Sequence, residues 1–266
     1  MQARSDEGEI ASFEADRLLV HIFEDRVAAG EAAARGVAED MRELVRARGS
    51  LGMVFASAPS QLELLQALVV TPDLPWNRVA AFHLDEYVGI GSDEPRSFVR
   101  FLREHLFERV EMAETHLLNG VASSAAEECQ RYQALLRSHR LDIACIGIGE
   151  NGHIAFNEPG ETDFDDPRLV RLVELDQASR RQQVNEGLFG SLDEVPTEAM
   201  TLTVPAITSV KRIHCIVPGR NKARAVERTV EGEMSTACPA SVLRAHPGAV
   251  LYLDRESASL LSGRAS

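Results

Sequence analysis

The stretch LDIACIGIGENGHIAFNEPG, residues 141–160, decides how the rest of the chain is interpreted. Its apolar start, 141–148, is typical of a buried strand and stops abruptly at a glycine-rich segment. Glycines allow a tight turn and close approach to a ligand. His153 can titrate near neutral pH, and Glu158 can orient it or help to move a proton. This combination predicts a strand that ends in a functional loop; the alternative is a turn whose polar groups only satisfy the backbone.

Similar apolar runs alternate with helical stretches along the whole chain. Such alternation predicts a parallel sheet covered by helices. We therefore expect an α/β fold: a single-domain, three-layer, doubly wound, mostly parallel sheet with helices on both faces. The expected strands are 18–23, 51–56, 78–84, 141–148, 169–175, 211–217 and 249–253, and the expected helices are 26–46, 61–70, 95–109, 123–140, 179–188, 219–230 and 239–243.

The domain organisation follows from the same pattern. Residues 1–16 are polar and acidic, and we expect them to form a flexible N-terminal tail. Residues 17–266 show no repeat, low-complexity segment or long linker, so they are expected to form one α/β domain. The apolar run 202–210 is compatible with either a helix or a strand.

Composition restricts the partners. The 266 residues carry 41 acidic and 28 basic side chains, a net charge of -13, which disfavours nucleic acid and anionic membranes. No apolar run approaches the roughly 20 residues of a membrane span, and the N-terminus lacks the features of a signal peptide. The four cysteines are widely spaced. We expect a cytoplasmic protein that binds a small molecule, and a homo-oligomer is left open.

Polar clusters follow four of the expected strands, after residues 56, 84, 148 and 217. Ligands of open α/β sheets bind at the carboxyl ends of the strands, so these clusters predict one composite site. Asp85 and Glu86 form the second cluster and offer a general base. Neighbouring side chains alternate in an extended segment, so we expect only one of the two to point into the cleft. The alternative is a solvated turn or a helix cap.

The central loop also allows other chemistry. Gly147, Gly149 and Gly152 match the dinucleotide-binding pattern G-x-G-x-x-G. The neighbouring His153 and Glu158 are unfavourable for binding a pyrophosphate, so this match is weak. A metal on His153 and Glu158 would lack a recognised set of further ligands. The chain contains no G-x-S-x-G motif of a serine hydrolase. On these residues alone, a dinucleotide is disfavoured and a metal stays possible.

An anion site is predicted near the start of the helix at 219–230. Backbone amides at a helix start attract anions, and Lys222 adds a positive charge. Ser57 and Ser60 offer further donors, and Arg180 lies on a segment that can reach the ligand. The alternatives are an ordinary helix start and a solvated helix face.

These motifs resemble the glucosamine-6-phosphate deaminase (isomerase) family, which is related to the 6-phosphogluconolactonases. The resemblance covers nearly the whole chain, and its most specific part is 147–159, similar to the family's G-x-G-x-[DN]-G-H-I-A-F-N-E-P. The Phe-Asn-Glu-Pro ending favours the deaminase branch. The other matching segments are 82–89, 199–203, 219–222, 239–246 and 254–256.

The resemblance implies a hydrolase-type reaction of amino-sugar catabolism, in which glucosamine 6-phosphate and water give fructose 6-phosphate and ammonia. Asp85 would move the C2 proton to C1, and His153 would assist ring opening. Glu158 would tune His153, with Asn151 as the third member of the relay. The resemblance implies no metal and no organic cofactor. We expect Ser57, Ser60, Glu86, Gly149, Gly152, Arg180 and Lys222 to bind the sugar phosphate, and residues 165–195 to form a lid.

Three departures from the family pattern concern the site. Asn151 replaces an aspartate found in some members, so it can orient Glu158 but cannot ionise. The family's phosphate loop T-G-G-T-P corresponds here to 55–59, without its glycines and threonines. Gln183 stands where some members carry a lid arginine. The alternatives are therefore an isomerase, deaminase or lactonase for another sugar or sugar phosphate, and a sugar-phosphate sensor without turnover.

Overall fold

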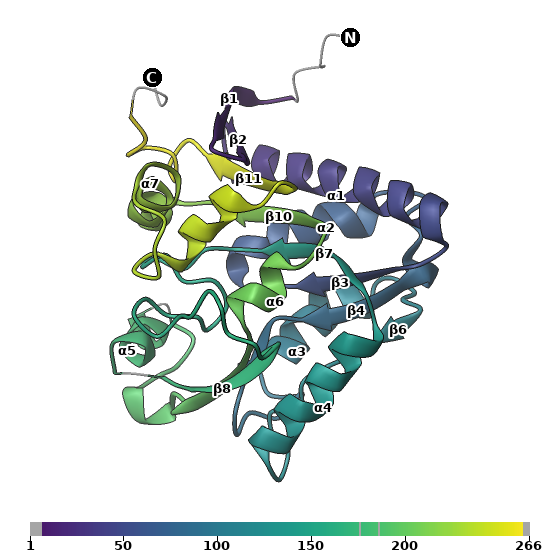
Figure 1. The fold of residues 1–266 in the computed structure, drawn as a ribbon, viewed down its shortest axis with the longest axis vertical. Coiled ribbons are helices and arrows are strands. Elements are labelled where there is room, and N and C mark those ends of the chain that lie inside the picture. The colour runs from purple at the N-terminus through teal and green to yellow at the C-terminus, as the bar shows by residue number, and fades with distance from the viewer. Residues whose placement is uncertain (1–6, 176, 186, 263–266) are drawn as a thin grey trace.

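The central sheet of the computed structural model has eight strands and separates two layers of helices (Figure 1). The structure describes residues 7–175, 177–185 and 187–262. All neighbouring strands are parallel except the first pair. The order across the sheet is β1 (Glu9–Ala15), β2 (Leu18–Phe23), β11 (Ala249–Asp254), β10 (Arg212–Val217), β7 (Leu141–Ile146), β3 (Leu51–Phe55), β4 (Val79–His83) and β6 (Glu114–Thr115).

The helices cover both faces, as the sequence pattern predicts. Among the described residues, four helices follow strands of the large sheet, one follows a strand of a second, smaller sheet, and two lie in the segment between β7 and β10. The helices are α1 (Arg26–Arg48), α2 (Leu62–Val70), α3 (Phe98–Leu102), α4 (Ala125–Ser138), α5 (Gln177–Asn185), α6 (Val204–Thr208) and α7 (Ala223–Glu231). Short helical turns also occur at Pro59–Gln61, Trp76–Arg78, Arg103–Phe107, Leu192–Glu194, Arg220–Lys222 and Pro239–Ala245.

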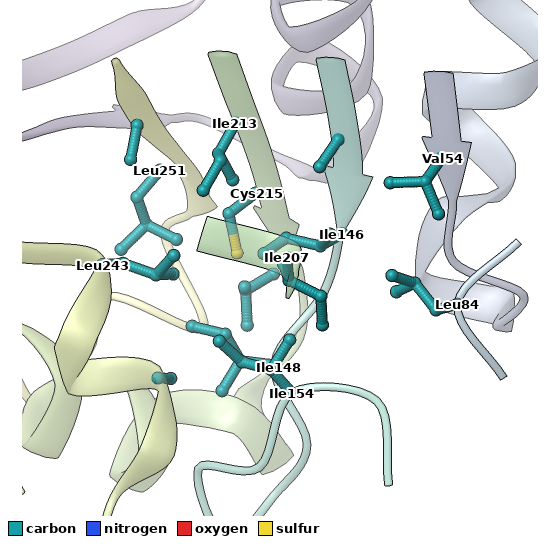
Figure 2. Packing of buried hydrophobic residues seen from close by; sticks show 14 of the residues in the cluster. Val54, Leu84, Ile146, Ile148, Ile154, Ile207, Ile213, Cys215, Leu243 and Leu251 are labelled. Carbon is teal, nitrogen blue, oxygen red and sulfur yellow. The ribbon is translucent and has the colours of Figure 1, made fainter. Parts of the chain in front are cut away.

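Alternate residues of the strands supply two separate cores. On β3, Met53 and Phe55 pack under α1 and α2, whereas Val54 faces the other layer. Figure 2 shows this second core, where Ile207 of α6 packs against sheet residues such as Cys215. Both faces of the sheet are therefore buried, which explains why its strands are nearly continuous apolar runs.

The first strand corrects the expected N-terminal tail. Residues 9–15 pair antiparallel with β2 through a two-residue turn at Asp16, whose φ is 53°. Phe13 and Ala15 pack against the core while Ser12 and Glu14 are exposed. The alternation of inward and outward side chains along this strand was overlooked because the segment has an acidic composition. Residues 1–6 of the predicted tail lie outside the described part of the chain.

A small antiparallel sheet, which the sequence analysis did not predict, covers one end of the molecule. It consists of β5 (Asp85–Tyr87), β9 (Glu198–Leu202) and β8 (Val170–Glu174) in that order. The ambiguous run 202–210 is divided between the end of β9 and α6. Thr203 separates the two, since its hydroxyl accepts a hydrogen bond from the Ala206 amide and caps α6.

The segment between β5 and β6 differs from the single helix expected at 95–109. Ser97 caps α3, which continues as a π-type turn, Arg103–Phe107. Within the described residues, the structure has no helix that is both long and apolar enough to cross a membrane.

Candidate active site

A cavity of about 200 Å³ lies at the carboxyl ends of four neighbouring strands. Its lining comes from the segments that follow β3, β4, β7 and β10, where the sequence places its four polar clusters. The four polar clusters therefore meet at one cavity, as the sequence predicts. Of the predicted site residues, the cavity is lined by Ser57, Ser60, Asp85, Gly149, His153 and Lys222.

Asp85 stands at the start of β5, directly beyond the end of β4. It is paired with Thr201 of β9, which fixes its backbone against the small antiparallel sheet. Its side chain lines the cavity, but the residue is only 8% exposed. Burial, with a smaller contribution from the charge of Glu86, raises the pKa of Asp85 to about 8. A carboxylate with such a pKa is a stronger base than an ordinary aspartate.

Glu86 is a correction to the predicted substrate contacts. Its carboxylate points away from the cavity and accepts hydrogen bonds at the start of α3, at 2.7 Å from the Ser97 hydroxyl and 3.0 Å from the Val99 amide. Burial raises the pKa of Glu86, and these hydrogen bonds oppose the rise. Glu86 therefore anchors α3, and only one of the two adjacent acids faces the cleft, as strand alternation predicts.

The central loop brings His153, Glu158 and Asn151 together. Nδ1 of His153 lies 3.1 Å from Oε1 of Glu158, within ion-pair distance although not aligned for a hydrogen bond. The side-chain amide of Asn151 donates to Oε2 of Glu158 at 2.6 Å, and its oxygen accepts from the His153 amide at 3.1 Å. Asn151 thus holds both other members in place, the orienting role expected of an asparagine here.

Two glycines make room for this arrangement. A Cβ atom on Gly149 would lie 2.2 Å from the His153 ring, so only glycine lets the imidazole occupy its place. Gly152 has a φ of +95°, and a Cβ there would lie 2.7 Å from Sγ of Cys238. Gly152 lies outside the cavity lining, so its expected role in substrate binding is replaced by a role in shaping the turn.

The end of the loop is fastened to β9. The side-chain amide of Asn157 donates to the carbonyls of Ile154 and Leu202 at 2.9 and 2.8 Å, and the Phe156 amide donates to the Thr201 hydroxyl at 3.1 Å. Ala155, between Ile154 and Phe156, has a φ of +51° and lines the cavity. The Thr201 contact was missed from the sequence because it joins positions 45 residues apart.

Ser57, Ser60 and Lys222 line the cavity near the start of two helical segments. Oγ of Ser57 is buried and has no hydrogen-bond partner among the described residues. Ser60 accepts a hydrogen bond from Gln61 at 3.2 Å, and Gln61 was not predicted as a site residue. Lys222 ends the turn that leads into α7. A buried hydroxyl without a partner, together with a cation, suits a ligand with anionic oxygen atoms.

The predicted lid contributes aromatic and polar side chains to the cavity. The Tyr87 hydroxyl donates to Oε1 of Gln183 on α5 at 2.9 Å, and Phe189 also lines the cavity. Arg96, which the sequence analysis did not select, lies 5.0 Å from the centre of the Phe189 ring and lines the same cavity. A lone arginine between two structural elements offers little to recognise in the sequence.

Arg180 is a third correction, after Glu86 and Gly152. Its guanidinium donates to the carbonyls of Leu192 and Val195, at 2.6 and 2.9 Å, and the residue does not line the cavity. Arg180 therefore holds the lid segment together in this structure. Side chains of neighbouring positions 178, 179, 182 and 185 lie outside the description.

The chain is similar in sequence to several known proteins. Residues 24–252 match the family described as glucosamine-6-phosphate isomerases/6-phosphogluconolactonase. A glucosamine-6-phosphate deaminase of Listeria innocua is 40% identical over 212 residues, which cover 80% of this chain and 87% of the relative. A glucosamine-6-phosphate deaminase of Bacillus cereus is 38% identical over 213 residues, covering 80% and 78% of the two chains.

Solved structures agree with this relationship. A monomeric glucosamine-6-phosphate deaminase superposes with a TM-score of 0.83 at 33% identity, covering 91% of this chain and 99% of the other. A 6-phosphogluconolactonase from Shewanella baltica shares the fold, with a TM-score of 0.74 at 20% identity, over 91% and 99% of the chains. The chain belongs to the glucosamine-6-phosphate isomerase/6-phosphogluconolactonase family.

Proposed function

We propose that this protein is a glucosamine-6-phosphate deaminase, an enzyme of amino-sugar catabolism that converts glucosamine 6-phosphate and water into fructose 6-phosphate and ammonia. The observation that carries the proposal is the pairing, in one cavity, of a buried aspartate of raised pKa with a separate His153–Glu158 relay. Its relatives of 40% and 33% identity carry the same activity in their names.

The first step of the proposed reaction opens the sugar ring. His153 gives a proton to the ring oxygen and takes up the proton of the C1 hydroxyl. The bond between C1 and the ring oxygen breaks, and an aldehyde forms at C1. Glu158, which lies 3.1 Å from Nδ1, stabilises the charged imidazole. Asn151 holds that carboxylate in place through its hydrogen bond. Nε2 of His153 would act on the substrate.

The second step moves a proton between adjacent carbons. Asp85 removes the proton from C2, which is acidified by the carbonyl at C1, and returns it to C1. The product is an imine at C2, and water replaces its nitrogen to release ammonia. A base of pKa near 8 is matched to such a proton transfer near neutral pH. This water-consuming course is the basis for the proposed hydrolase-type assignment.

The phosphate group would bind where Ser57 and Lys222 line the cavity. The rewritten loop 55–59 lacks the family's glycines, but Ser57 presents a buried hydroxyl that lacks a partner among the described residues, and Lys222 supplies positive charge. These features support a phosphorylated substrate over an unphosphorylated sugar. We also propose a cytoplasmic location, since the four cysteines are free and buried, as suits a reducing compartment.

A substrate panel tests the proposal. Purified protein is supplied with glucosamine 6-phosphate, glucosamine, N-acetylglucosamine 6-phosphate and 6-phosphogluconolactone, and ammonia release and lactone hydrolysis are measured. We expect turnover of glucosamine 6-phosphate alone. Faster turnover of the lactone or of unphosphorylated glucosamine would replace the proposed substrate. Saturable binding of glucosamine 6-phosphate with no product would identify a sensor instead.

A further inference from the structure

Two histidines and a glutamate converge at the edge of the large sheet, away from the catalytic cavity. Glu114 lies on β6, and His116 is the residue directly after this strand. The two residues are two positions apart in an extended segment, so their side chains point to the same face. His139 is the residue that ends α4, and β6 lies near that end of the helix (Figure 1). Oε2 of Glu114 is 2.9 Å from Nε2 of His116 and 3.3 Å from Nε2 of His139.

The hydrogen bonds of His139 determine what its Nε2 atom offers. Nδ1 lies 2.9 Å from the carbonyl oxygen of Leu135, which can only accept. The Ser138 hydroxyl, 3.1 Å from Nδ1, donates to the same carbonyl, so Nδ1 carries the proton. In the neutral ring, Nε2 therefore directs a lone pair at the Glu114 carboxylate. Two electron-rich atoms at 3.3 Å repel each other unless a proton or a cation lies between them. A histidine fixed in this way by a backbone carbonyl is typical of a metal ligand.

The surroundings hold the cluster in place and leave one side open. The His116 amide donates to the Ala81 carbonyl at 2.8 Å, which ties the residue to β4. The Phe82 ring packs against both imidazoles, with ring centroids 4.9 Å from His116 and 5.5 Å from His139. The Glu114 side chain is 57% exposed, so solvent can supply a further ligand. An apolar ring beside the donor set limits the access of solvent and lowers the local dielectric, which strengthens the attraction between a cation and the carboxylate.

We propose that Glu114, His116 and His139 bind one divalent transition-metal ion with the ligand preferences of zinc. Imidazole nitrogen and carboxylate oxygen are ligands of zinc, and ligand atoms at ~2.0–2.1 Å around a tetrahedral ion lie about 3.3 Å from one another. The three ligand atoms here already lie within 4.8 Å of one another. Small rotations of the side chains bring them to that spacing.

The ion would act as a cross-link. Glu114 and His116 lie at the edge strand of the sheet, and His139 lies at the end of α4. One ion would therefore join this edge of the sheet to the end of α4. Binding to the folded state alone stabilises it. The site shares no residue with the cavity lining, so the role is separate from the catalytic steps.

Zinc titration of tag-free, metal-stripped protein tests this site. Calorimetry with ZnCl₂ is expected to show a site of 1:1 stoichiometry, and zinc is expected to raise the melting temperature. His139→Ala and Glu114→Gln should each weaken that binding at least tenfold and remove the thermal shift. His105→Ala, a histidine outside the cluster, should bind zinc as the unsubstituted protein does.

Two results would overturn the site. One is the absence of saturable zinc binding, and the other is equal affinity in Glu114→Gln and the unsubstituted protein. Because Glu114 is largely exposed, its variant should fold even if His139→Ala does not. Co²⁺ provides a second readout: intense visible absorption bands of a tetrahedral ion should appear on binding, disappear on adding zinc, and be missing in Glu114→Gln.

Discussion

The side-chain amide of Asn151 donates a hydrogen bond of 2.6 Å to Glu158, and the same side chain accepts one from the His153 backbone. A residue that cannot ionise thus fixes the two that can. The relay of this chain is therefore a two-member ionisable pair with a neutral support. Its geometry depends on Asn151 even though no proton passes through that residue.

Replacement of Asn151 by alanine should lower kcat. Without the amide, Glu158 loses its anchor and the His153 ring its alignment, and misplacement of this order costs roughly tenfold to a hundredfold in rate. KM should change less, because Asn151 does not line the cavity. Steady-state kinetics compare Asn151→Ala with Asn77→Ala, an exposed asparagine outside the site. An unchanged kcat in Asn151→Ala would contradict the supporting role.

Gly149→Ala should disable the same relay by steric means alone. The new Cβ would lie 2.2 Å from the His153 ring, which must move away. We expect kcat to fall at least tenfold, in line with the sensitivity of proton transfer to position. Gly91→Ala is the matched control, since its Cβ would meet its nearest atom at 3.7 Å. Equal activity of the two variants would show that the turn adapts without cost.

The Asp85→Asn variant should be more stable than the unsubstituted protein, and this difference should grow as the pH rises. The folded-state pKa of Asp85 is raised from 3.8 to about 8, so between these values the folded state keeps a proton that the unfolded chain releases. Stability due to this group is then lost with increasing pH, by at most about 1.4 kcal/mol per pH unit. Asparagine removes this loss.

The measurement is urea unfolding of both proteins from pH 5 to pH 8. The gain in unfolding free energy should grow with pH and reach roughly 1–4 kcal/mol at pH 8. Asp73→Asn changes an exposed aspartate and should show no such trend. A gain that is constant or that shrinks with pH would mean that the pKa of Asp85 is not raised.

Lys222→Ala should weaken binding of the substrate's phosphate group. Loss of one charge-assisted hydrogen bond costs about 1.5–3 kcal/mol, which corresponds to a roughly 10- to 100-fold rise in KM for glucosamine 6-phosphate. Ser57→Ala should act in the same direction with a smaller effect. Arg224→Ala removes an exposed cation two residues from Lys222 and serves as control. If KM stays constant in Lys222→Ala, the phosphate lies elsewhere.

Much of the fold could be predicted because the strands of the parallel sheet are buried on both faces. Their apolar runs, such as 141–148, ended at loops that form the cavity. β1 escaped prediction because its inward residues, including Phe13, are only partly buried and alternate with acids. In the small sheet, β5 pairs with β9 across more than 100 residues, as in Asp85 with Thr201, and local sequence does not reveal such a pairing.

The site was predictable where a motif fixes both the residue and its surroundings, as for His153 with Glu158. It was less so where the direction of a side chain decides the role. Asp85 and Glu86 are adjacent acids, and only the start of α3 explains why Glu86 turns away from the cavity. Arg180 satisfies carbonyls of its own segment, a contact that depends on the three-dimensional course of the lid.

Ammonia release from glucosamine 6-phosphate by the unsubstituted protein and by Asp85→Asn is the most direct test of the central claim. If Asp85 is the base that moves the C2 proton, the unsubstituted protein releases ammonia and forms fructose 6-phosphate. Asp85→Asn then loses about 10²–10⁴-fold in kcat while it still folds and binds the sugar phosphate. Ammonia release at similar rates by both proteins, or by neither, would contradict the account.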